Sequence, residues 1–490
     1  MASNANNLSR GHWRFAIVTL LAYLLVTGIV LFKHEPWRDE AQAWLIARDV
    51  SFFHIFRQVS YEGTAALWHV MLVPLAKSGL PYVSAFILHL ALAAAAVMIL
   101  LLYAPFSRMT KVLFAFSYYM AYEYAIIARN YNLTILLLFA LAALHAKRFQ
   151  RPMLYAGLVF LLFNTNLHSG FVAVAILLLF AWEFFQRPVR PAGGYAAMVI
   201  MVLGGVAAFL QLRPAPDAVQ TRWFEQFNFW APPFILSNAF FARFPGNNAV
   251  AALFVLAAAL IALSRKPAPF FVILFSYTGL FYTLLFQRYG SERHHGLVLI
   301  FLVFALWLAD HYEQTDWFKL KNALLAKLAD SGLLTGTCMV VLNVCLAASV
   351  ISALGAWGAE YFVMFSGAKD MANHIKKNHL EDRTIVAHFS SAGAALLPFL
   401  PGKKFWYPDV EAFGTYITWN KQQNETGRMS DPEAIARARR AFPNDRTMLL
   451  LLSRPLKDPQ QYGFALMYNT SPEVIRDRGE ETFYLYRRTD

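Results

Sequence analysis

The residues best suited to chemistry are carboxylates in a polar stretch that follows the first apolar run of the chain. Asp39 and Glu40 are adjacent, and Glu62 lies further along the same stretch in Tyr61-Glu62-Gly63. A carboxylate can abstract a proton from a hydroxyl group or bind a divalent cation. The structural alternative is a solvated helix start, since acidic residues also favour the first turn of a helix.

Complementary cationic and polar side chains lie in three later polar turns. These turns contribute Arg129, Tyr131, His168, Arg288, Arg293 and His294. Guanidinium groups and imidazoles bind phosphate oxygens well, and an Arg–phosphate pair can form two parallel hydrogen bonds. A charge bounded by apolar segments as tightly as Arg129 usually needs a partner. Binding of lipid headgroups, or anchoring at the membrane interface, is the structural alternative.

Together these residues predict a site with an acidic part and a basic part. Such a site suits transfer of a group that is carried on a lipid phosphate, because a carboxylate can deprotonate an acceptor hydroxyl while cations stabilise the departing phosphate.

The elements that must position these residues are apolar segments. Of the 490 residues, 58% are hydrophobic and 15% are charged, whereas a soluble domain has roughly 25% charged residues. A helix needs about 20 apolar residues to cross a membrane. Eleven segments of roughly that kind are predicted, at 15–32, 82–104, 112–128, 132–146, 153–167, 170–185, 195–212, 249–264, 269–286, 296–309 and 332–355.

Basic residues predict the orientation of these spans. They fall on alternate connections, which the positive-inside rule places in the cytoplasm: Arg10 and Arg14, Arg108 and Lys111, Lys147 to Arg151, Arg187 and Arg190, Arg265 and Lys266, and Lys319 to Lys327. We therefore expect a cytoplasmic N-terminus, a surface-lying helix at 64–79 and an extracytoplasmic C-terminus. The net charge of +13 is distributed over these connections and does not indicate nucleic-acid binding.

The last part of the chain has an ordinary soluble composition. Helices are expected at 369–378 and 432–441, and strands at 384–388, 448–452 and 482–486. This alternation predicts a small α/β domain. The predicted fold is thus an all-α polytopic membrane domain at 1–359, with an outer loop at 33–81, followed by an extracytoplasmic α/β domain at 360–490. The outer connection at 213–248 is rich in aromatic residues, which is typical of an interfacial belt.

The order of these motifs resembles a known superfamily. Arg38-Asp39-Glu40 after the first span, Tyr61-Glu62-Gly63 with Leu67-Trp68, and Arg129-Asn130-Tyr131 in the next outer turn are similar to motifs of the C-type glycosyltransferases (GT-C). Within that superfamily they look most like the protein mannosyltransferase and aminoarabinose transferase branch. The resemblance covers residues 10–310. At 64–66 the chain has Thr-Ala-Ala, where relatives often carry a His or Lys and a proline.

The resemblance implies transfer of a sugar from a polyprenyl-phosphate donor, with inversion. We expect the site to face the periplasm from a bacterial inner membrane. It implies that Asp39 is the catalytic base, and that Glu40 and Glu62 orient the acceptor or hold a divalent cation, Mg²⁺ or Mn²⁺. Arg129 and the turn with Arg293 and His294 would bind the donor phosphate. The acceptor could be a lipid, a glycan or a protein.

Two other functions fit a multi-span chain. A transporter or flippase of a lipid-linked substrate needs ionisable residues near the middle of the membrane, but here the middles of most spans are Leu, Ala, Val and Phe. A non-catalytic assembly subunit does not need acidic and basic residues gathered on one side.

Overall fold

The computed structural model describes residues 9–219, 229–246, 248–287, 290–315, 332–426, 429–475 and 481–490. Lys319 to Lys327, and parts of the aromatic connection at 213–248, lie outside these ranges. The chain divides into two compact units. The first comprises residues 1–29, 88–210 and 221–357, and the second comprises residues 30–87, 211–220 and 358–490. The predicted outer loop and the C-terminal segment thus belong to one unit.

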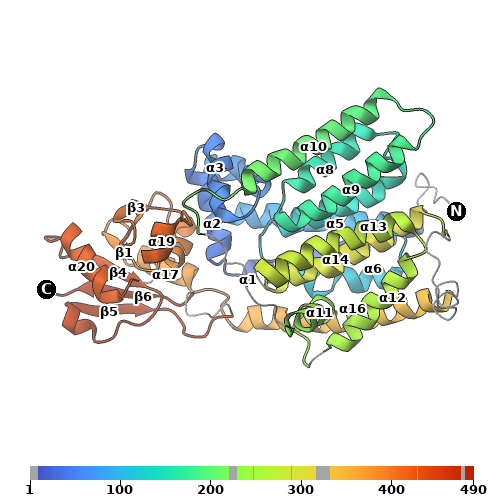
Figure 1. Cartoon of the computed structure of the whole chain (residues 1–490). Coiled ribbons are helices and arrows are strands. Elements are labelled where there is room, and N and C mark those ends of the chain that lie inside the picture. The colour runs from blue at the N-terminus through green and yellow to red at the C-terminus, as the bar shows by residue number, and fades with distance from the viewer. Residues whose placement is uncertain are drawn as a thin grey trace. The chain divides into compact units, whose positions relative to one another are not determined.

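Apolar α-helices dominate the chain (Figure 1). Within the described residues, seven helices are long and apolar enough to cross a membrane, and shorter apolar helices accompany them. The long ones are α1 (Arg10–Lys33), α5 (Val83–Tyr103), α9 (Leu167–Phe185), α10 (Ala192–Leu212), α13 (Pro267–Tyr282), α14 (Glu292–Leu308) and α16 (Gly332–Phe362). The shorter ones include α7 (Tyr131–Leu144), α8 (Pro152–Phe163) and α12 (Ala249–Leu263). A multi-span helical membrane protein, as predicted from the composition, is therefore confirmed.

Helix α14 forms the core of the first unit. Every residue from His295 to Ala305 is buried, and so are Trp307 and Leu308. A helix that is apolar on all sides needs an apolar environment, and here α7, α11 (Ala231–Phe241) and α13 pack against it.

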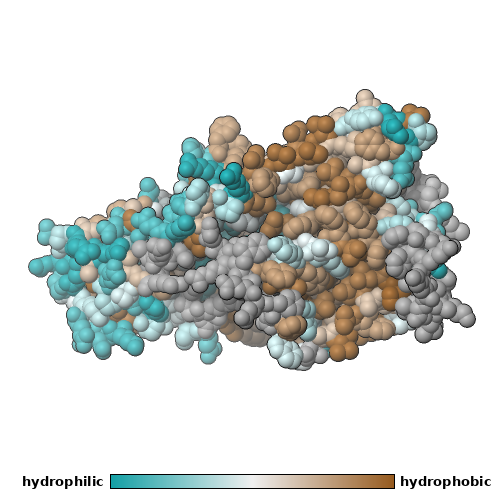
Figure 2. Space-filling model, in the orientation of Figure 1, coloured by the Kyte–Doolittle hydropathy of each residue, from teal (hydrophilic) through white to brown (hydrophobic). Residues whose placement is uncertain are grey.

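Other helices of this unit expose apolar side chains. On α10, Val199, Leu203 and Phe209 are exposed, and Figure 2 shows hydrophobic surface over the helices of this unit. Leu, Val and Phe on an outer surface match the hydrocarbon of a lipid bilayer, which satisfies no polar group.

The expected span at 112–128 is not a continuous helix. Helix α6 (Arg108–Ala115) ends within it, and a short π-helix, η1 (Tyr119–Glu123), follows before the chain turns. The reason lies in buried tyrosines whose hydroxyl groups need partners: Tyr119 donates to Asn238 O, and Tyr124 donates to Arg293 O, each at 2.7 Å. Similarly, the connection expected at 213–248 contains helix α11, because it buries Ile235, Ala239 and Phe240.

In the second unit, three helices follow α1: α2 (Arg38–Asp49), α3 (Phe52–Glu62) and α4 (Leu67–Lys77). The described part of the C-terminal segment forms a six-stranded mixed sheet in the order β3-β2-β1-β4-β6-β5. Its strands are β1 (Ile385–Ala387), β2 (Phe405–Tyr407), β3 (Ala412–Gly414), β4 (Leu449–Leu452), β5 (Phe464–Asn469) and β6 (Tyr484–Arg488). β1 is parallel to β2 and β4, and the remaining pairs are antiparallel.

The predicted C-terminal elements are all present. Helices α17 (Ala368–Lys377) and α20 (Asp431–Ala441), and strands β1, β4 and β6, each overlap an expected element, with β6 shifted by two residues. Strand β4 is buried on both faces, as expected for a central strand. β2, β3 and β5 were not expected from the sequence.

Helix α2 belongs to the core of the C-terminal domain. Ala41 and Leu45, both 0% exposed, share one apolar cluster with Ile385, Ala387 and Leu451. The alternate residues of the two strands, such as Val386 and Leu450, face a second cluster on the opposite side of the sheet. The helix that contains Asp39 and Glu40 packs against η5 (Ala394–Phe399), and the apolar cluster that they share extends to one face of the C-terminal sheet.

Candidate active site

Asp39 and Glu40 occupy the first turn of α2, where their charges favour the positive end of the helix dipole. Both residues are therefore at the helix start that the structural alternative predicted, but their environments differ. The Asp39 side chain is 22% exposed and lies 3.8 Å from Arg38 Nε, whereas the Glu40 side chain is 0% exposed. Asp39 is accessible to an acceptor hydroxyl, and Glu40 is enclosed by protein.

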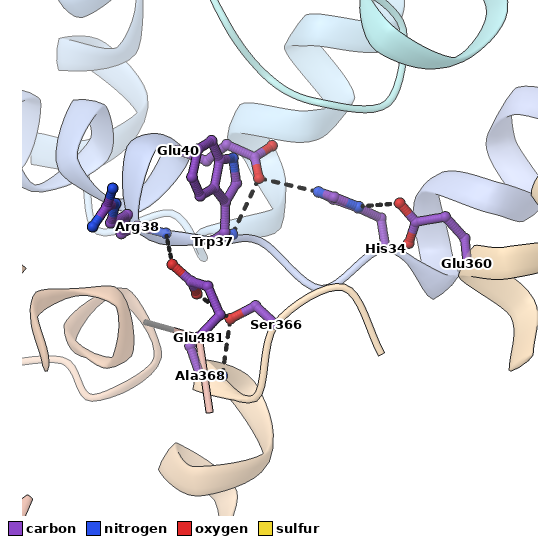
Figure 3. A network of polar contacts seen from close by, with 8 residues as sticks. All are labelled: His34, Trp37, Arg38, Glu40, Glu360, Ser366, Ala368 and Glu481. Atoms are coloured by element: carbon purple, nitrogen blue, oxygen red, sulfur yellow. Dashed lines mark hydrogen bonds and ion pairs between the residues drawn. The ribbon is translucent and has the colours of Figure 1, made fainter. Parts of the chain in front are cut away.

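The Glu40 carboxylate belongs to a buried network of hydrogen bonds and ion pairs (Figure 3). Its Oε2 accepts hydrogen bonds from His34 Nε2 at 3.0 Å and from Trp37 N at 3.2 Å, the latter just before the helix begins. The other ring nitrogen of His34, Nδ1, lies 3.0 Å from Glu360 Oε1. Burial alone lowers the pKa of His34, but Glu360 and Glu40 together raise it to about 10. The imidazole is therefore a cation between two carboxylates at neutral pH.

A second buried carboxylate supports the same turn from the C-terminal domain. Glu481 is 2% exposed, and it accepts hydrogen bonds from Ser366 Oγ at 2.6 Å and from Arg38 N at 3.4 Å. Burial raises the pKa of Glu481 to about 7, although the Ser366 hydrogen bond and Arg38 oppose the shift.

The raised pKa of Glu481 predicts that the folded protein loses stability as pH rises from about 4.5 to about 7. A carboxyl group with a higher pKa in the folded state stabilises the fold below its unfolded pKa, and this contribution is lost as the buried group ionises. The difference between the folded and unfolded pKa values of Glu481 corresponds to about 3 kcal/mol of folding free energy. We expect Glu481→Gln to flatten the decrease in thermal unfolding midpoint between pH 5 and 7.5. Glu473→Gln, at an exposed position, should retain the wild-type slope, and an unchanged slope in Glu481→Gln would contradict the assignment.

Glu62, the third predicted carboxylate, lies at the end of α3 and has different partners. Its Oε1 accepts from Gln42 Nε2 at 2.9 Å and from Gln58 Nε2 at 3.4 Å. Gln42 Nε2 also donates to Ile417 O at 2.6 Å, while its Oε1 accepts from Ile417 N at 3.0 Å. One amide side chain thus links Glu62 to the backbone of the C-terminal domain.

The carboxylates predicted to hold a divalent cation do not share their partners. Glu40 is bound by His34 and Trp37, and Glu62 by Gln42 and Gln58. In the described ranges, no group of three or more His, Cys, Asp or Glu side chains could hold a metal ion. Mg²⁺ or Mn²⁺ stays a prediction, and no reaction step is derived through it.

Three of the predicted phosphate-binding residues lie together in the first unit. The ring of His294 is 5.6 Å from that of Tyr131 and 5.2 Å from that of His168. We call these three residues the Tyr–His cluster. Each one lies in the first turn of a helix: Tyr131 in α7, His168 in α9 and His294 in α14. The positive ends of three helix dipoles therefore meet at the Tyr–His cluster, and such an arrangement favours an anion.

Local hydrogen bonds fix the His294 ring in one tautomer. Its Nδ1 accepts from Ser291 N at 3.0 Å, so the proton of the neutral imidazole is on Nε2. An Nε2–H group can donate to a phosphate oxygen.

The predicted arginines flank the Tyr–His cluster in sequence. Arg129 lies two residues before α7, next to Asn130, whose Nδ2 donates to Thr165 O at 2.8 Å. Arg293 precedes His294, and its carbonyl accepts from Tyr124. Arg288 lies outside the described residues. The carboxylates are in the second unit and the Tyr–His cluster is in the first.

Three site residues were not predicted. His34 binds Glu40 through Nε2 and Glu360 through Nδ1, and the ring of Tyr124 stacks on Tyr131 at 6.1 Å and 28°. A signal for Glu360 was available, because an acidic residue at the end of a long apolar helix usually has a partner. For Tyr124, the signal was a run of tyrosines in a segment taken as a span.

The fold defines this chain as a multi-span helical membrane protein with a mixed-sheet C-terminal domain. In particular, it is similar to two crystal structures of ArnT from Cupriavidus metallidurans. The chain matches the structure bound to undecaprenyl phosphate with a TM-score of 0.54 and 13% identity, over 97% of this chain and 98% of that one. For the apo state the TM-score is 0.54 and the identity 13%, over 96% and 97%.

The match confirms, at the level of the fold, the predicted resemblance to GT-C transferases of the aminoarabinose transferase branch. No protein-family model matches the chain. No curated protein matches it in sequence.

Proposed function

We propose that this protein is an inverting membrane glycosyltransferase. It moves a sugar from a polyprenyl-phosphate donor to a hydroxyl group of an extracytoplasmic lipid, glycan or protein. The observation that carries this proposal is the near full-length likeness to ArnT, one structure of which is bound to undecaprenyl phosphate. The accessible carboxylate of Asp39 and the Tyr–His cluster support it independently.

The reaction that we propose needs one base and one anion site. The acceptor oxygen attacks the anomeric carbon of the sugar while Asp39 takes the hydroxyl proton. The bond between that carbon and the phosphate oxygen breaks, and the phosphate leaves with the bonding electrons. Arg129, Arg293 and the Tyr–His cluster stabilise the phosphate as its charge develops. Glu62 orients the acceptor.

The proposed topology has eleven spans, with the N-terminus in the cytoplasm and the site on the periplasmic side of a bacterial inner membrane. Its support is the alternation of basic connections along the sequence and the apolar helices that occupy every predicted span except the one at 112–128.

The test of the donor class is mass spectrometry of lipids that co-purify with the protein. We expect wild-type protein to retain a polyprenyl phosphate or its glycosylated form. We expect the amount of polyprenyl phosphate retained by Arg129→Ala to be at least about tenfold lower. The reason is that one charge-assisted interaction with phosphate contributes about 1.5–3 kcal/mol.

The matched control is Arg190→Ala, which removes an exposed arginine on a connection predicted to be cytoplasmic, and which should leave lipid retention unchanged. Equal retention in wild type and Arg129→Ala would remove the phosphate-binding role of Arg129. Retention of the lipid together with no sugar transfer to any acceptor would favour the transporter or the assembly subunit over the enzyme.

A further inference from the structure

The imidazole of His34 lies between the carboxylates of Glu40 and Glu360 (Figure 3). The side chains of His34, Glu40 and Glu360 are each 0 or 1% exposed, and both ring nitrogens of His34 are 3.0 Å from a carboxylate oxygen. Phe365 lies against the imidazole, with a distance of 4.6 Å between ring centroids. The ring therefore cannot turn without breaking both contacts.

The charges of this group depend on one another. An unpaired buried charge is strongly unfavourable, whereas a buried pair with good geometry is stable. Here one imidazolium lies between two carboxylates, which raise the pKa of His34 to about 10 against the opposing effect of burial. Loss of His34 leaves two buried carboxylates without a cation, and loss of either carboxylate leaves the imidazolium with only one of its two hydrogen-bonded partners, so each member depends on the others.

Glu40 connects this unit to the proposed catalytic residue. Its Oε2 accepts from both His34 Nε2 and Trp37 N, and Asp39 lies between Trp37 and Glu40 in the same helical turn. The hydrogen bond from Trp37 N to the Glu40 side chain joins the two ends of this turn. The turn therefore sets the direction of the Asp39 side chain. Phe365 also packs edge-on against Trp37, at 6.4 Å and 70°.

We propose that His34 and Glu360 are positioning residues that fix the first turn of α2 and thereby orient the Asp39 carboxylate. The role in turnover rests on the proposed function, whereas the restraint on the helical turn does not. Neither residue touches the reacting atoms. Glu40 belongs to the same clamp, which consists of His34, Glu40 and Glu360.

The test compares single and double variants in the full-length protein. Glu360→Gln keeps a hydrogen-bond acceptor for His34 but removes one charge. The double variant His34→Gln with Glu360→Gln removes one positive and one negative charge, so the net charge of the buried group is unchanged and Glu40 keeps Trp37 N as a donor. The folded fraction of each variant is measured by thermal unfolding. Glu411→Gln is the matched control, because its side chain is 58% exposed and far more solvated.

Two measurements test whether His34 and Glu360 position Asp39: hydrogen–deuterium exchange and steady-state kinetics. Hydrogen–deuterium exchange of peptides from residues 36–46 reports the restraint without any need for turnover. We expect faster exchange there in Glu360→Gln and in the double variant, with unchanged exchange in β1 and β4. We also expect kcat to fall about 10- to 100-fold, since a small misplacement of a catalytic group has effects of this size. The KM for the polyprenyl-phosphate donor should not change.

A purely structural role would give a different pattern. It would lower the folded fraction, and kcat per molecule of donor-binding protein would stay at the wild-type value. Wild-type exchange in residues 36–46 of the double variant, or wild-type kcat in folded double variant, would overturn the proposal. If wild-type protein transfers no sugar, the proposed function fails, and the exchange experiment still decides whether the clamp exists.

Discussion

Asp39→Asn is expected to lower sugar transfer by about 100- to 10,000-fold, which is the range that general-base catalysis contributes. Asparagine has nearly the same shape but cannot accept the hydroxyl proton. The substitution removes an acidic group from the first turn of α2, which costs only about 0.3–1 kcal/mol of stability. We therefore expect the thermal unfolding midpoint, and the amount of co-purified polyprenyl phosphate, to stay close to wild type. The measurement is initial rate with a polyprenyl-phosphate sugar.

Asp49→Asn is the matched control for this prediction. Asp49 is the last residue of the same helix, its side chain is 26% exposed, and it pairs with Arg48 at 2.8 Å. Both substitutions make the same chemical change at a similarly exposed position on α2. Wild-type turnover in Asp39→Asn, or an equal loss in both variants, would exclude Asp39 as the base.

Leu45→Ala is expected to loosen strands that lie hundreds of residues later in the chain. Leu45 is 0% exposed and shares an apolar cluster with Ile385 of β1 and Leu451 of β4. Truncating a buried leucine costs about 2–5 kcal/mol, because transfer free energy is lost and a cavity remains. We expect faster hydrogen–deuterium exchange in peptides that contain β1 and β4. Turnover should fall as the folded fraction falls.

The control for this variant is Leu80→Ala. Leu80 lies in the same unit and is 47% exposed, so its truncation should change exchange in β1 and β4 very little. If Leu45→Ala leaves those strands at the wild-type rate, α2 is not part of the core of the C-terminal domain.

Local patterns were sufficient to predict much of the fold. Long apolar helices and the alternation in the C-terminal segment are encoded by neighbouring residues, and the elements at 369–378 and 448–452 were found where the sequence placed them. The expected span at 112–128 was wrong as a continuous helix because its tyrosine hydroxyls bond to distant carbonyl groups, such as that of Asn238. No property of residues 112–128 alone contains that information.

In the candidate site, too, local sequence predicted some features, whereas others depend on residues far apart in the chain. The carboxylates of Asp39, Glu40 and Glu62 are conspicuous in a polar stretch, and the comparison with ArnT agrees with the family that they suggested. The difference between an accessible Asp39 and an enclosed Glu40 depends on His34 and on Glu360, which is 326 residues away from His34. Such long-range pairing cannot be derived from one sequence without its homologues.

The amide of Gln42 joins the backbone of Ile417, 375 residues further along the chain. A ribosome that adds about 5–20 residues per second needs roughly 20–75 s to make that intervening stretch. During this interval helix α2 has already been synthesised, but the C-terminal sheet that completes its apolar cluster has not. Helix α2 is thus among the first parts to be synthesised and among the last to reach its final packing. Nascent chains should therefore acquire a protected α2 only after β4 and β6 have been made.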